Sequence, residues 1–311
     1  MRGKDLESTL FQRYNLDHVP AFRLNPVRRK YRRKLVRLIC EGRIRLEHFL
    51  ACPCGSDSLR RIADKDRFGL LFSNFICKNC GLLVLSPRIS DKTLSLYYKE
   101  IYHPLIFGVP QGTLLENLVR DKQGEKIFDF VKDYLKKSII NVCEVGLAGG
   151  YNLLTFQDLG KCKGIECKLY RSEYEEHYAA HAKEKGISVT NGGIEFLSQL
   201  GVKFDVIILS HVLEHFFSTK RELNTLRELL NDDGLLYVEV PGVINLLIYS
   251  NDLIEYLVHA HNYNFNLNSL ERILNITGFA MVSGNEKVQA LFQKGNANNN
   301  ASLSERSTLS R

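Results

Sequence analysis

The strongest constraint on the fold is an apolar segment that breaks into a glycine-rich turn, NVCEVGLAGGY at residues 141–151. An apolar run bounded by glycines predicts a buried strand. Gly146 permits a sharp turn, while Gly149 and Gly150 permit a ligand to approach the backbone closely. A helix is expected to follow at residues 151–159. A strand, turn and helix in this order are typical of an α/β fold that holds a cofactor at the beginning of the helix.

Strand and helix patterns alternate through the rest of the chain. Such alternation predicts a doubly wound, mostly parallel sheet of the Rossmann-like type. A closing hairpin at residues 279–295 supplies the sixth and seventh strands and makes the last one antiparallel. The other expected strands are residues 138–146, 161–167, 187–193, 204–212 and 234–242, and the expected helices are residues 116–137, 151–159, 169–185, 218–231 and 268–278.

An acidic residue narrows the choice of ligand. Glu166 lies twenty residues after Gly146, at the expected end of the second strand, where a carboxylate accepts both hydroxyls of a ribose. A dinucleotide-binding turn requires glycine where Ala148 and Tyr151 stand, and a P-loop requires a lysine followed by serine or threonine. S-adenosylmethionine carries no phosphate, and its carboxylate suits the amino end of a helix. The alternative is an ordinary turn that binds nothing.

Four of the eight cysteines form two close pairs, Cys52 with Cys54 and Cys77 with Cys80. The second pair has the spacing of a metal knuckle, and four thiolates complete a tetrahedral structural zinc site. A catalytic zinc is disfavoured because four protein ligands leave no open position. Only one residue separates the first pair, so His48 is an alternative to one of its thiolates. Remnant thiols without metal are the other interpretation.

Residues 1–50 carry 13 Lys/Arg against 5 Asp/Glu. Most of this excess lies in a segment that Asn25 can cap, Pro26 can begin and Gly42 can end, which predicts a helix. One interpretation is a solvated basic face whose apolar stripe packs on the protein. The other is a contact with an anionic partner, either a membrane surface or RNA. The apolar stripe comprises Tyr31, Leu35, Leu38 and Ile39.

The chain divides by composition into four segments. Residues 1–50 form the basic helical extension, 51–100 the zinc-ribbon-like domain and 101–293 the α/β domain. Residues 294–311 are polar and without periodicity, which predicts a disordered tail.

No apolar run approaches the roughly 20 residues that span a bilayer. The first residues lack the apolar core of a secretory signal, so a cytoplasmic protein is expected.

The glycine turn resembles a known family. Glu144-Val145-Gly146 followed by Gly150 is similar to the first motif of class I S-adenosylmethionine-dependent methyltransferases, with Ala148 in place of its middle glycine. Residues 204–216 and 229–242 resemble the segments of the fourth and fifth strands. The resemblance covers residues 116–295 and implies S-adenosylmethionine as cofactor. The contacts that it implies are Glu144, Gly146, Gly149, Gly150, Glu166, Gly193, Ile194 and Ser210.

The amino-terminal part resembles a subgroup of this family. Residues 52–56 and 77–98 are similar to the zinc ribbon that precedes the methyltransferase fold in deoxysugar C-methyltransferases and enzymes of surface-polysaccharide biosynthesis. In the sugar C-methyltransferases a later His-Glu-His run ends in the base. Here the run is His259-Ala260-His261, so His261 keeps the position of the base. The implied acceptor is a small molecule or glycan, through a sugar hydroxyl or a sugar-linked intermediate.

Two histidines are candidates for the chemistry. An alcohol acceptor needs a base as its oxygen attacks, and histidine has a suitable pKa. His211, after the fourth strand, and His261 are therefore the predicted catalytic groups. His211 to His215 also match H-x-x-E-H, but that zinc-protease motif requires a helix. Relatives that methylate phenolic quinone precursors bind a metal with Glu-x-x-Glu-His here. Since His211 replaces the first glutamate, Glu214 and His215 are expected to fix the turn.

Two other functions remain open from the sequence. An RNA methyltransferase would use the zinc ribbon and the basic helix to hold phosphates. A non-catalytic binding module with a degenerate cofactor site would explain the alanine at position 148.

Overall fold

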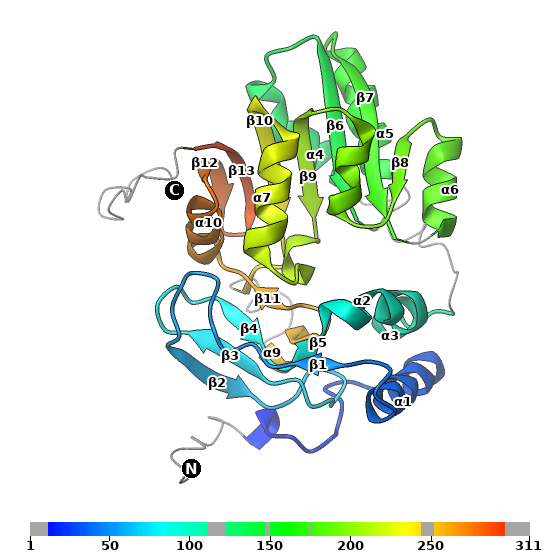
Figure 1. Cartoon of the computed structure of the whole chain (residues 1–311), viewed down its shortest axis with the longest axis vertical. Helices are drawn as coiled ribbons and strands as arrows, with labels where there is room; N and C mark the ends of the chain where they lie inside the picture. Colours follow the sequence, from blue (N-terminus) through cyan, green and yellow to red (C-terminus); the bar gives the residue numbers. More distant parts are fainter. Residues whose placement is uncertain (1–11, 111–121, 147–149, 175, 244–251, 296–311) are drawn as a thin grey trace.

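The computed structural model of the chain describes residues 12–110, 122–146, 150–174, 176–243 and 252–295. Within these residues, a large α/β part lies above a smaller amino-terminal part (Figure 1). No helix in these ranges combines the length and apolar character needed to cross a membrane. Most of the predicted polar tail, residues 296–311, lies outside the described residues.

The large part is built on a seven-stranded sheet in the order β12-β13-β10-β9-β6-β7-β8. Strands β6 to β10 are parallel, and β13 runs antiparallel between β10 and β12. This arrangement confirms the expected doubly wound, mostly parallel sheet. The strands are β6 (Ile139–Val145), β7 (Glu166–Glu173), β8 (Ser188–Asn191), β9 (Phe204–Ser210), β10 (Leu230–Glu239), β12 (Phe279–Asn285) and β13 (Gln289–Lys294).

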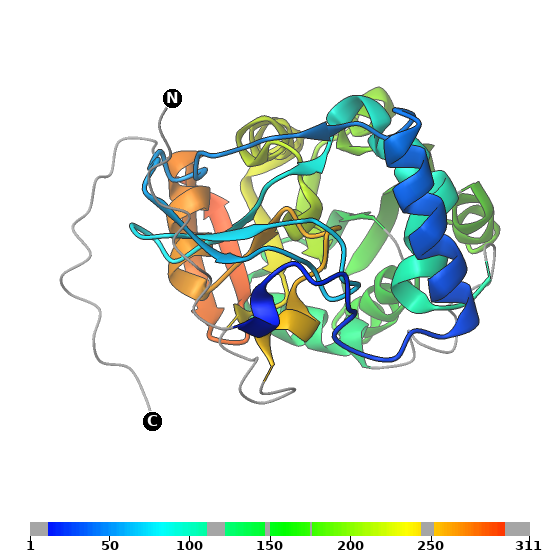
Figure 2. The same cartoon turned by 90° about the horizontal axis from the view of Figure 1, so that it is seen from below.

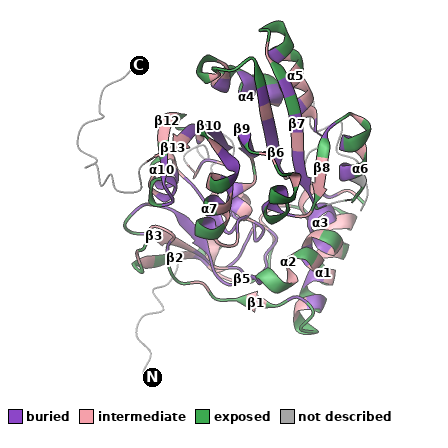
Figure 3. Ribbon diagram, turned by 45° about the horizontal axis from the view of Figure 1, so that its top comes forward, coloured by how far each residue is buried: buried purple, intermediate pink, exposed green. Residues whose placement is uncertain are grey.

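Both faces of this sheet are buried beneath helices. Along β9, Val206 and Ile208 belong to one apolar cluster, whereas Ile207 and Leu209 belong to another. Such alternation is expected of a central strand with helices on both sides. Figure 3 shows the buried colour on the central strands and exposed residues on the outer helices. One face carries α4 (Gln123–Val131), α5 (Tyr151–Cys162) and α6 (Glu176–Glu184), and the other carries η4 (Ile194–Leu200), α7 (Thr219–Leu229) and α10 (Leu267–Ile276).

The second strand and the helix after it differ from the sequence prediction. The expected strand at residues 161–167 is wrong, because α5 continues to Cys162 and β7 begins only at Glu166. Helix α6 begins at Glu176, so residues 169–173 are strand and not helix. Two charged residues inside β7, Arg171 and Glu173, are buried and interrupt its apolar pattern. The helix expected to reach residue 137 ends at Val131 and continues as η3 (Lys132–Tyr134), and its first residues lie outside the described ranges.

The amino-terminal part combines short helices with two small sheets. Asn25 caps the basic helix α1 (Pro26–Cys40) as expected, since its side chain accepts a hydrogen bond from the Arg28 backbone amide. Helix α1 lies against α3, because the Arg28 side chain donates to carbonyl oxygens of Leu105 and Ile106 (Figure 2). The other helical segments are η1 (Gln12–Tyr14), α2 (Asp91–Tyr97), the π-helical turn η2 (Tyr98–Tyr102) and α3 (His103–Phe107).

A segment from late in the chain completes one of these small sheets. Strand β11 pairs antiparallel with β4, so the sheet order is β11-β4-β3-β2. Tyr263 of β11 shares an apolar cluster with Val84 and with the large sheet. The two parts of the molecule therefore share a core. The short strands are β1 (Leu46–Glu47), β2 (Leu59–Ala63), β3 (Asn74–Cys77), β4 (Leu83–Leu85), β5 (Arg88–Ile89) and β11 (Tyr263–Asn264), and the remaining helical turns are η5 (Leu213–His215) and α9 (Leu253–Tyr256).

Candidate functional site

The glycine turn lies between β6 and α5, at the carboxyl edge of the parallel strands. Gly146 has a φ of +91° and Gly150 a φ of +79°, which are left-handed values that favour glycine. A Cβ on Gly146 would lie 2.7 Å from Val212 Cγ2, and one on Gly150 would collide with Ile187 Cδ1. Both positions therefore require glycine. The predicted contact Gly149, together with Ala148, lies outside the described residues.

A buried ion-pair network lies directly beneath this turn. Glu144 accepts hydrogen bonds from Asn152 Nδ2 at 2.7 Å and from Arg171 Nη1 at 2.9 Å. The other terminal nitrogen of Arg171 donates to Glu173 at 3.0 Å and to the Gly146 carbonyl oxygen. Burial raises the pKa of Glu144, although Arg171 and Asn152 act in the opposite direction. Since protein donors occupy both of its carboxylate oxygens, Glu144 anchors the turn.

The acid predicted to hold the ribose is placed at the wrong end of its strand. Glu166 begins β7 and pairs with Ile139, the first residue of β6. It is exposed and lies seven strand residues, about 23 Å, from the carboxyl end of β7. The buried carboxylate of Glu173 ends β7 instead. The sequence pattern contains no clear signal for an acid at position 173, because Arg171 and Glu173 are both buried and interrupt the apolar pattern of β7.

The ends of the neighbouring strands lie beside Glu173. The backbone amide of Gly192 donates to the Glu173 carbonyl oxygen at 2.8 Å, which places Gly193 and the buried Ile194 at the same edge. Ser210 ends β9. The structure therefore brings together the described contacts that the sequence predicted, apart from Glu166.

His211 follows β9 with strained backbone geometry. Its φ of +55° is unusual for a residue other than glycine, and such strain is concentrated at functional sites. Its backbone amide donates to the Glu239 carbonyl oxygen at 2.8 Å, and 54% of its side chain is exposed. The fixed backbone thus presents the imidazole at the carboxyl edge of the sheet.

A group of polar side chains surrounds His211, which we call the His–Glu cluster: His211, Glu214, His215 and His261. Glu214 is buried, and its Oε1 lies 3.8 Å from His211 Nδ1 and 3.9 Å from His215 Nε2. The ring of His215 meets that of His261 edge-on, with centroids 4.9 Å apart. Within the described residues, neither Glu214 Oε2 nor His261 Nδ1 has a hydrogen-bond partner. The cluster therefore offers an acceptor atom and an imidazole nitrogen to a ligand.

The local environment shifts the pKa values of these side chains in different directions. Burial, and then the neighbouring His215, lowers the pKa of His261 to about 3. Burial acts to lower the pKa of His211 as well, but Glu214 outweighs it and raises that pKa above its ordinary value. Burial acts to raise the pKa of Glu214, but the histidines hold it below its ordinary value. At neutral pH His261 is therefore neutral and Glu214 is ionised.

The same cluster contains potential metal ligands. Glu214, His215 and His261 each place one ligand atom within 4.8 Å of the others. The Ala260 carbonyl oxygen lies 2.8 Å from His215 Nδ1, which leaves Nε2 facing Glu214. Ligands on one divalent ion at 2.0–2.2 Å lie about 3–3.5 Å apart. The distance of 3.9 Å between Glu214 Oε1 and His215 Nε2 is wider, so this pair suits hydrogen bonds to a ligand better than direct coordination.

The four paired cysteines gather in the amino-terminal part, as the sequence predicted. Cys52 Sγ lies 3.5 Å from Cys80 Sγ, and Cys54 Sγ lies 3.7 Å from Cys77 Sγ. A tetrahedral zinc with bonds of 2.3 Å places its sulfurs about 3.8 Å apart. All four sulfurs lie within 4.8 Å of one another, so the short spacing of the first pair does not prevent a four-thiolate site. His48 is exposed and is not part of the group.

Sequence reasoning missed a buried hydrogen-bond chain next to His261. His259 Nδ1 lies 2.6 Å from Asp66 Oδ2, and its Nε2 lies 2.9 Å from the Tyr97 hydroxyl. The ring stacks on Phe72 with centroids 5.0 Å apart. This chain is enclosed in the amino-terminal core, so it holds residues 258–261 in place and thereby positions His261.

Comparison with known proteins gives a family match and distant structural similarities. The family described as a methyltransferase domain matches residues 119–284, just over half of the chain. No curated protein matches.

Three solved structures illustrate the structural similarity. The plantazolicin methyltransferase BpumL is 14% identical over 58% of this chain and 88% of its own, with a TM-score of 0.48. CcbJ from Streptomyces caelestis is 13% identical over 58% and 98%, with a TM-score of 0.45. An S-adenosylmethionine-dependent methyltransferase from Clostridium acetobutylicum is 12% identical over 66% and 99%, with a TM-score of 0.44. These scores are too low to transfer an acceptor to this chain.

Proposed function

The chain belongs to the family of methyltransferase domains, and from this premise we propose that it methylates a hydroxyl group of a sugar or a sugar-linked acceptor. The family match confirms the expected class of enzyme, an S-adenosylmethionine-dependent methyltransferase. The acceptor class rests on one observation, which is the pair of unpartnered atoms in the His–Glu cluster.

The residues at the carboxyl edge of the sheet suit the cofactor. Gly146 and Gly150 leave room for close approach at the amino end of α5. Glu173, whose side chain accepts a hydrogen bond from Arg171, is the acid at the carboxyl end of β7, the place from which a carboxylate binds ribose hydroxyls. Gly193 and Ile194 lie at the same carboxyl edge of the sheet, beside the end of β7. When bound, S-adenosylmethionine supplies a methyl group on a positively charged sulfur.

The His–Glu cluster suits an acceptor with hydroxyl groups. A buried polar atom without a partner costs about 1–3 kcal/mol, so Glu214 Oε2 and His261 Nδ1 both gain from a bound ligand. An ionised carboxylate accepts a hydrogen bond from one hydroxyl, and a neutral imidazole pairs with another. Neighbouring hydroxyls on one molecule are characteristic of sugars.

We assign the role of base to His211 and not to His261. A base works best when its pKa is close to the pH of the reaction, and a pKa of about 3 makes His261 a poor proton acceptor. His211 is partly exposed, and Glu214 raises its pKa. During methyl transfer, in which the methyl–sulfur bond breaks as the bond to the acceptor oxygen forms, His211 would take the hydroxyl proton and Glu214 would stabilise the resulting imidazolium.

Calorimetry with S-adenosylhomocysteine tests the cofactor site. We expect micromolar binding that weakens about tenfold in Glu173→Gln, which corresponds to about 1.4 kcal/mol. Glu166→Gln is the matched control, because that carboxylate lies at the opposite edge of the sheet. Circular dichroism confirms that each variant is folded. If the folded wild type does not bind, the protein is a binding module with a degenerate site.

A methylation assay then tests the acceptor. Sugar nucleotides, free glycans and RNA are incubated with labelled S-adenosylmethionine, and the position of the methyl group is determined by mass spectrometry. We expect O-methylation of a sugar and no labelling of RNA. Methylation of RNA alone would replace this proposal with the RNA methyltransferase that the sequence also allowed.

A further inference from the structure

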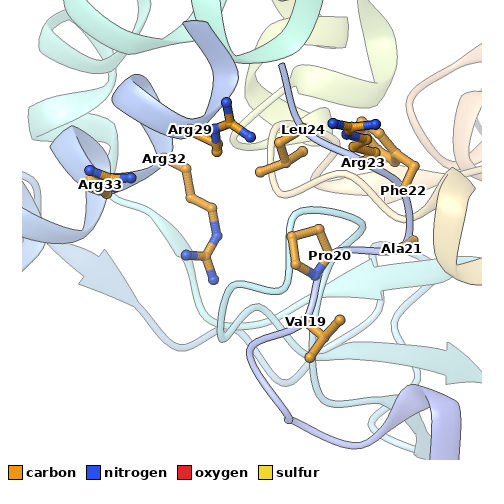
Figure 4. A pocket seen from close by; sticks show the side chains of 9 residues that line it. All are labelled: Val19, Pro20, Ala21, Phe22, Arg23, Leu24, Arg29, Arg32 and Arg33. Atoms are coloured by element: carbon orange, nitrogen blue, oxygen red, sulfur yellow. The ribbon is translucent and has the colours of Figure 1, made fainter. Parts of the chain in front are cut away.

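A cavity of about 560 Å³ lies between α1 and the loop of residues 19–24, in the amino-terminal part (Figure 4). Arg29, Arg32 and Arg33 rise from α1 on one side, and Arg23 comes from the loop. The other lining residues of the loop are apolar, and none of the described residues that line the cavity is acidic. We call this cavity the arginine pocket.

Hydrogen bonds to backbone carbonyl oxygens hold the walls of the arginine pocket in place. Arg32 Nε donates to the Phe68 carbonyl oxygen at 2.7 Å, and its Nη2 donates to the His18 carbonyl oxygen at 3.0 Å. The Ala21 amide donates to the Arg67 carbonyl oxygen at 2.8 Å. A Cβ on Gly69 would lie 2.7 Å from the His18 carbonyl oxygen, so this close contact requires glycine. The pocket is therefore formed before any ligand binds.

Arg32 donates hydrogen bonds to backbone carbonyl oxygens, whereas the other three arginines of the pocket have no such bonds among the described residues. Among the described residues, Arg23, Arg29 and Arg33 have no acidic partner, and all three are exposed. Elsewhere on α1, Lys34 pairs with Glu100 at 3.0 Å. In the loop, Asp17 is already paired with Lys65 at 2.6 Å.

The spacing of the arginines adds to the unbalanced charge. Arg29 and Arg33 lie four residues apart on one helix face, where like charges repel. An anion in the pocket would remove this repulsion.

The chemistry of the pocket favours phosphate on a partly apolar molecule. One guanidinium group can donate two parallel hydrogen bonds to two oxygens of the same phosphate. Val19 lines the pocket and is 58% exposed, and Val36 on α1 is 41% exposed. The ring of Phe22 is covered by Arg28 at 5.3 Å and Arg67 at 6.0 Å. These guanidinium contacts compete with the base stacking on which single-stranded RNA binding depends.

We propose that the arginine pocket binds the phosphate group of a partly apolar ligand, either a phospholipid headgroup or a free phosphorylated small molecule. This site is separate from the His–Glu cluster and does not depend on the proposed acceptor. Its apolar wall contacts the carbon part of the ligand, and the arginines of α1 that line the pocket contact the phosphate.

Binding to the full-length chain tests the proposal with two probes. Phenyl phosphate represents the free ligand, and phosphatidylcholine vesicles with and without phosphatidylglycerol represent the lipid. The double variant Arg29→Gln, Arg33→Gln is expected to weaken binding about thirtyfold, since each arginine contributes about fivefold. The matched control is Lys30→Gln, Arg37→Gln, which removes equal charge from the same helix outside the pocket. The control is expected to weaken binding less than about threefold.

Each outcome either distinguishes a free phosphorylated molecule from a phospholipid headgroup or contradicts the proposal. Binding of phenyl phosphate supports a free ligand, and binding only to phosphatidylglycerol vesicles supports a headgroup. The proposal is overturned if neither probe binds, if the control double variant weakens binding as much as the pocket variant, or if single-stranded RNA binds more tightly than both probes. Binding of S-adenosylhomocysteine is expected to be unchanged in both double variants, which separates this result from failure of the methyltransferase site.

Discussion

Two clusters of potential metal ligands lie in different parts of the molecule, and they differ in whether all of their ligand atoms have neighbouring partners. In the cysteine cluster, each sulfur lies within 3.7 Å of another, and all four lie within 4.8 Å of one another. In the His–Glu cluster, two buried atoms have no hydrogen-bond partner among the described residues. A closed set of ligands stabilises a fold, whereas an open set is available to a substrate.

The surroundings of the two clusters explain this difference. The cysteines lie at the turns of short strands, which provide little apolar core without a metal to join them. The His–Glu cluster lies at the edge of a sheet with a large core on both faces. The sheet is stable enough to tolerate strain at His211 and one oxygen of Glu214 without a hydrogen-bond partner. We propose zinc as the resident metal of the cysteine cluster alone.

Loss of one cysteine ligand is expected to have the largest effect. Structural zinc binding contributes about 10–16 kcal/mol in small zinc domains, and three thiolates retain only part of it. Cys77→Ser is expected to lose bound zinc and to unfold at a lower temperature, as measured by atomic absorption and calorimetry. The control is Cys162→Ser, an exposed thiol outside the cluster. A full zinc content in Cys77→Ser would show that the cluster is not a metal site.

Removal of the base ranks second. His211→Gln is expected to lower kcat by about 10²- to 10⁴-fold, because the proton of the acceptor hydroxyl then has no acceptor. Zinc content and affinity for S-adenosylhomocysteine are expected to remain at the wild-type level. His261→Gln is the comparison variant, and we expect it to act mainly on the acceptor KM. A larger loss of kcat in His261→Gln than in His211→Gln would return the role of base to His261.

Neutralising Glu214 is expected to have a smaller effect. Glu214→Gln keeps the shape of the side chain but removes the charge, so kcat/KM for the acceptor is expected to fall about tenfold. Steady-state kinetics at several acceptor concentrations measure this change, with Glu166→Gln as the control. An unchanged kcat/KM would mean that the unpartnered oxygen does not face the acceptor.

The pH profile gives the smallest but most specific effect. The base is active when neutral, so kcat/KM is expected to rise as pH increases through the pKa of His211, which Glu214 raises above 6.5. Because a carboxylate favours the protonated imidazole, removing its charge lowers that pKa. The acid limb of Glu214→Gln is therefore expected to move to lower pH. A limb that stays in place would show that His211 is not the titrating group.

The sequence predicted some local features because their signals are local. The glycine turn at Gly146, the cap at Asn25 and the knuckle at Cys77 each depend on the geometry of a few adjacent residues. Glu173 escaped prediction because a buried ion pair with Arg171 gives β7 a polar pattern. A sequence pattern does not show that a distant charge compensates a buried one.

By itself, the sequence determined the alternation of strands and helices, the family and the four thiols, since periodicity and spacing are properties of the chain. Only the tertiary structure decided which groups meet. Strand β11 joins the amino-terminal sheet from 180 residues away, Tyr263 facing Val84, and His261 meets Glu214 from a separate loop. Burial at that meeting point lowers the pKa of His261, and the pairing with Glu214 raises that of His211. The chemistry of each histidine therefore depends on long-range packing that residue spacing does not encode.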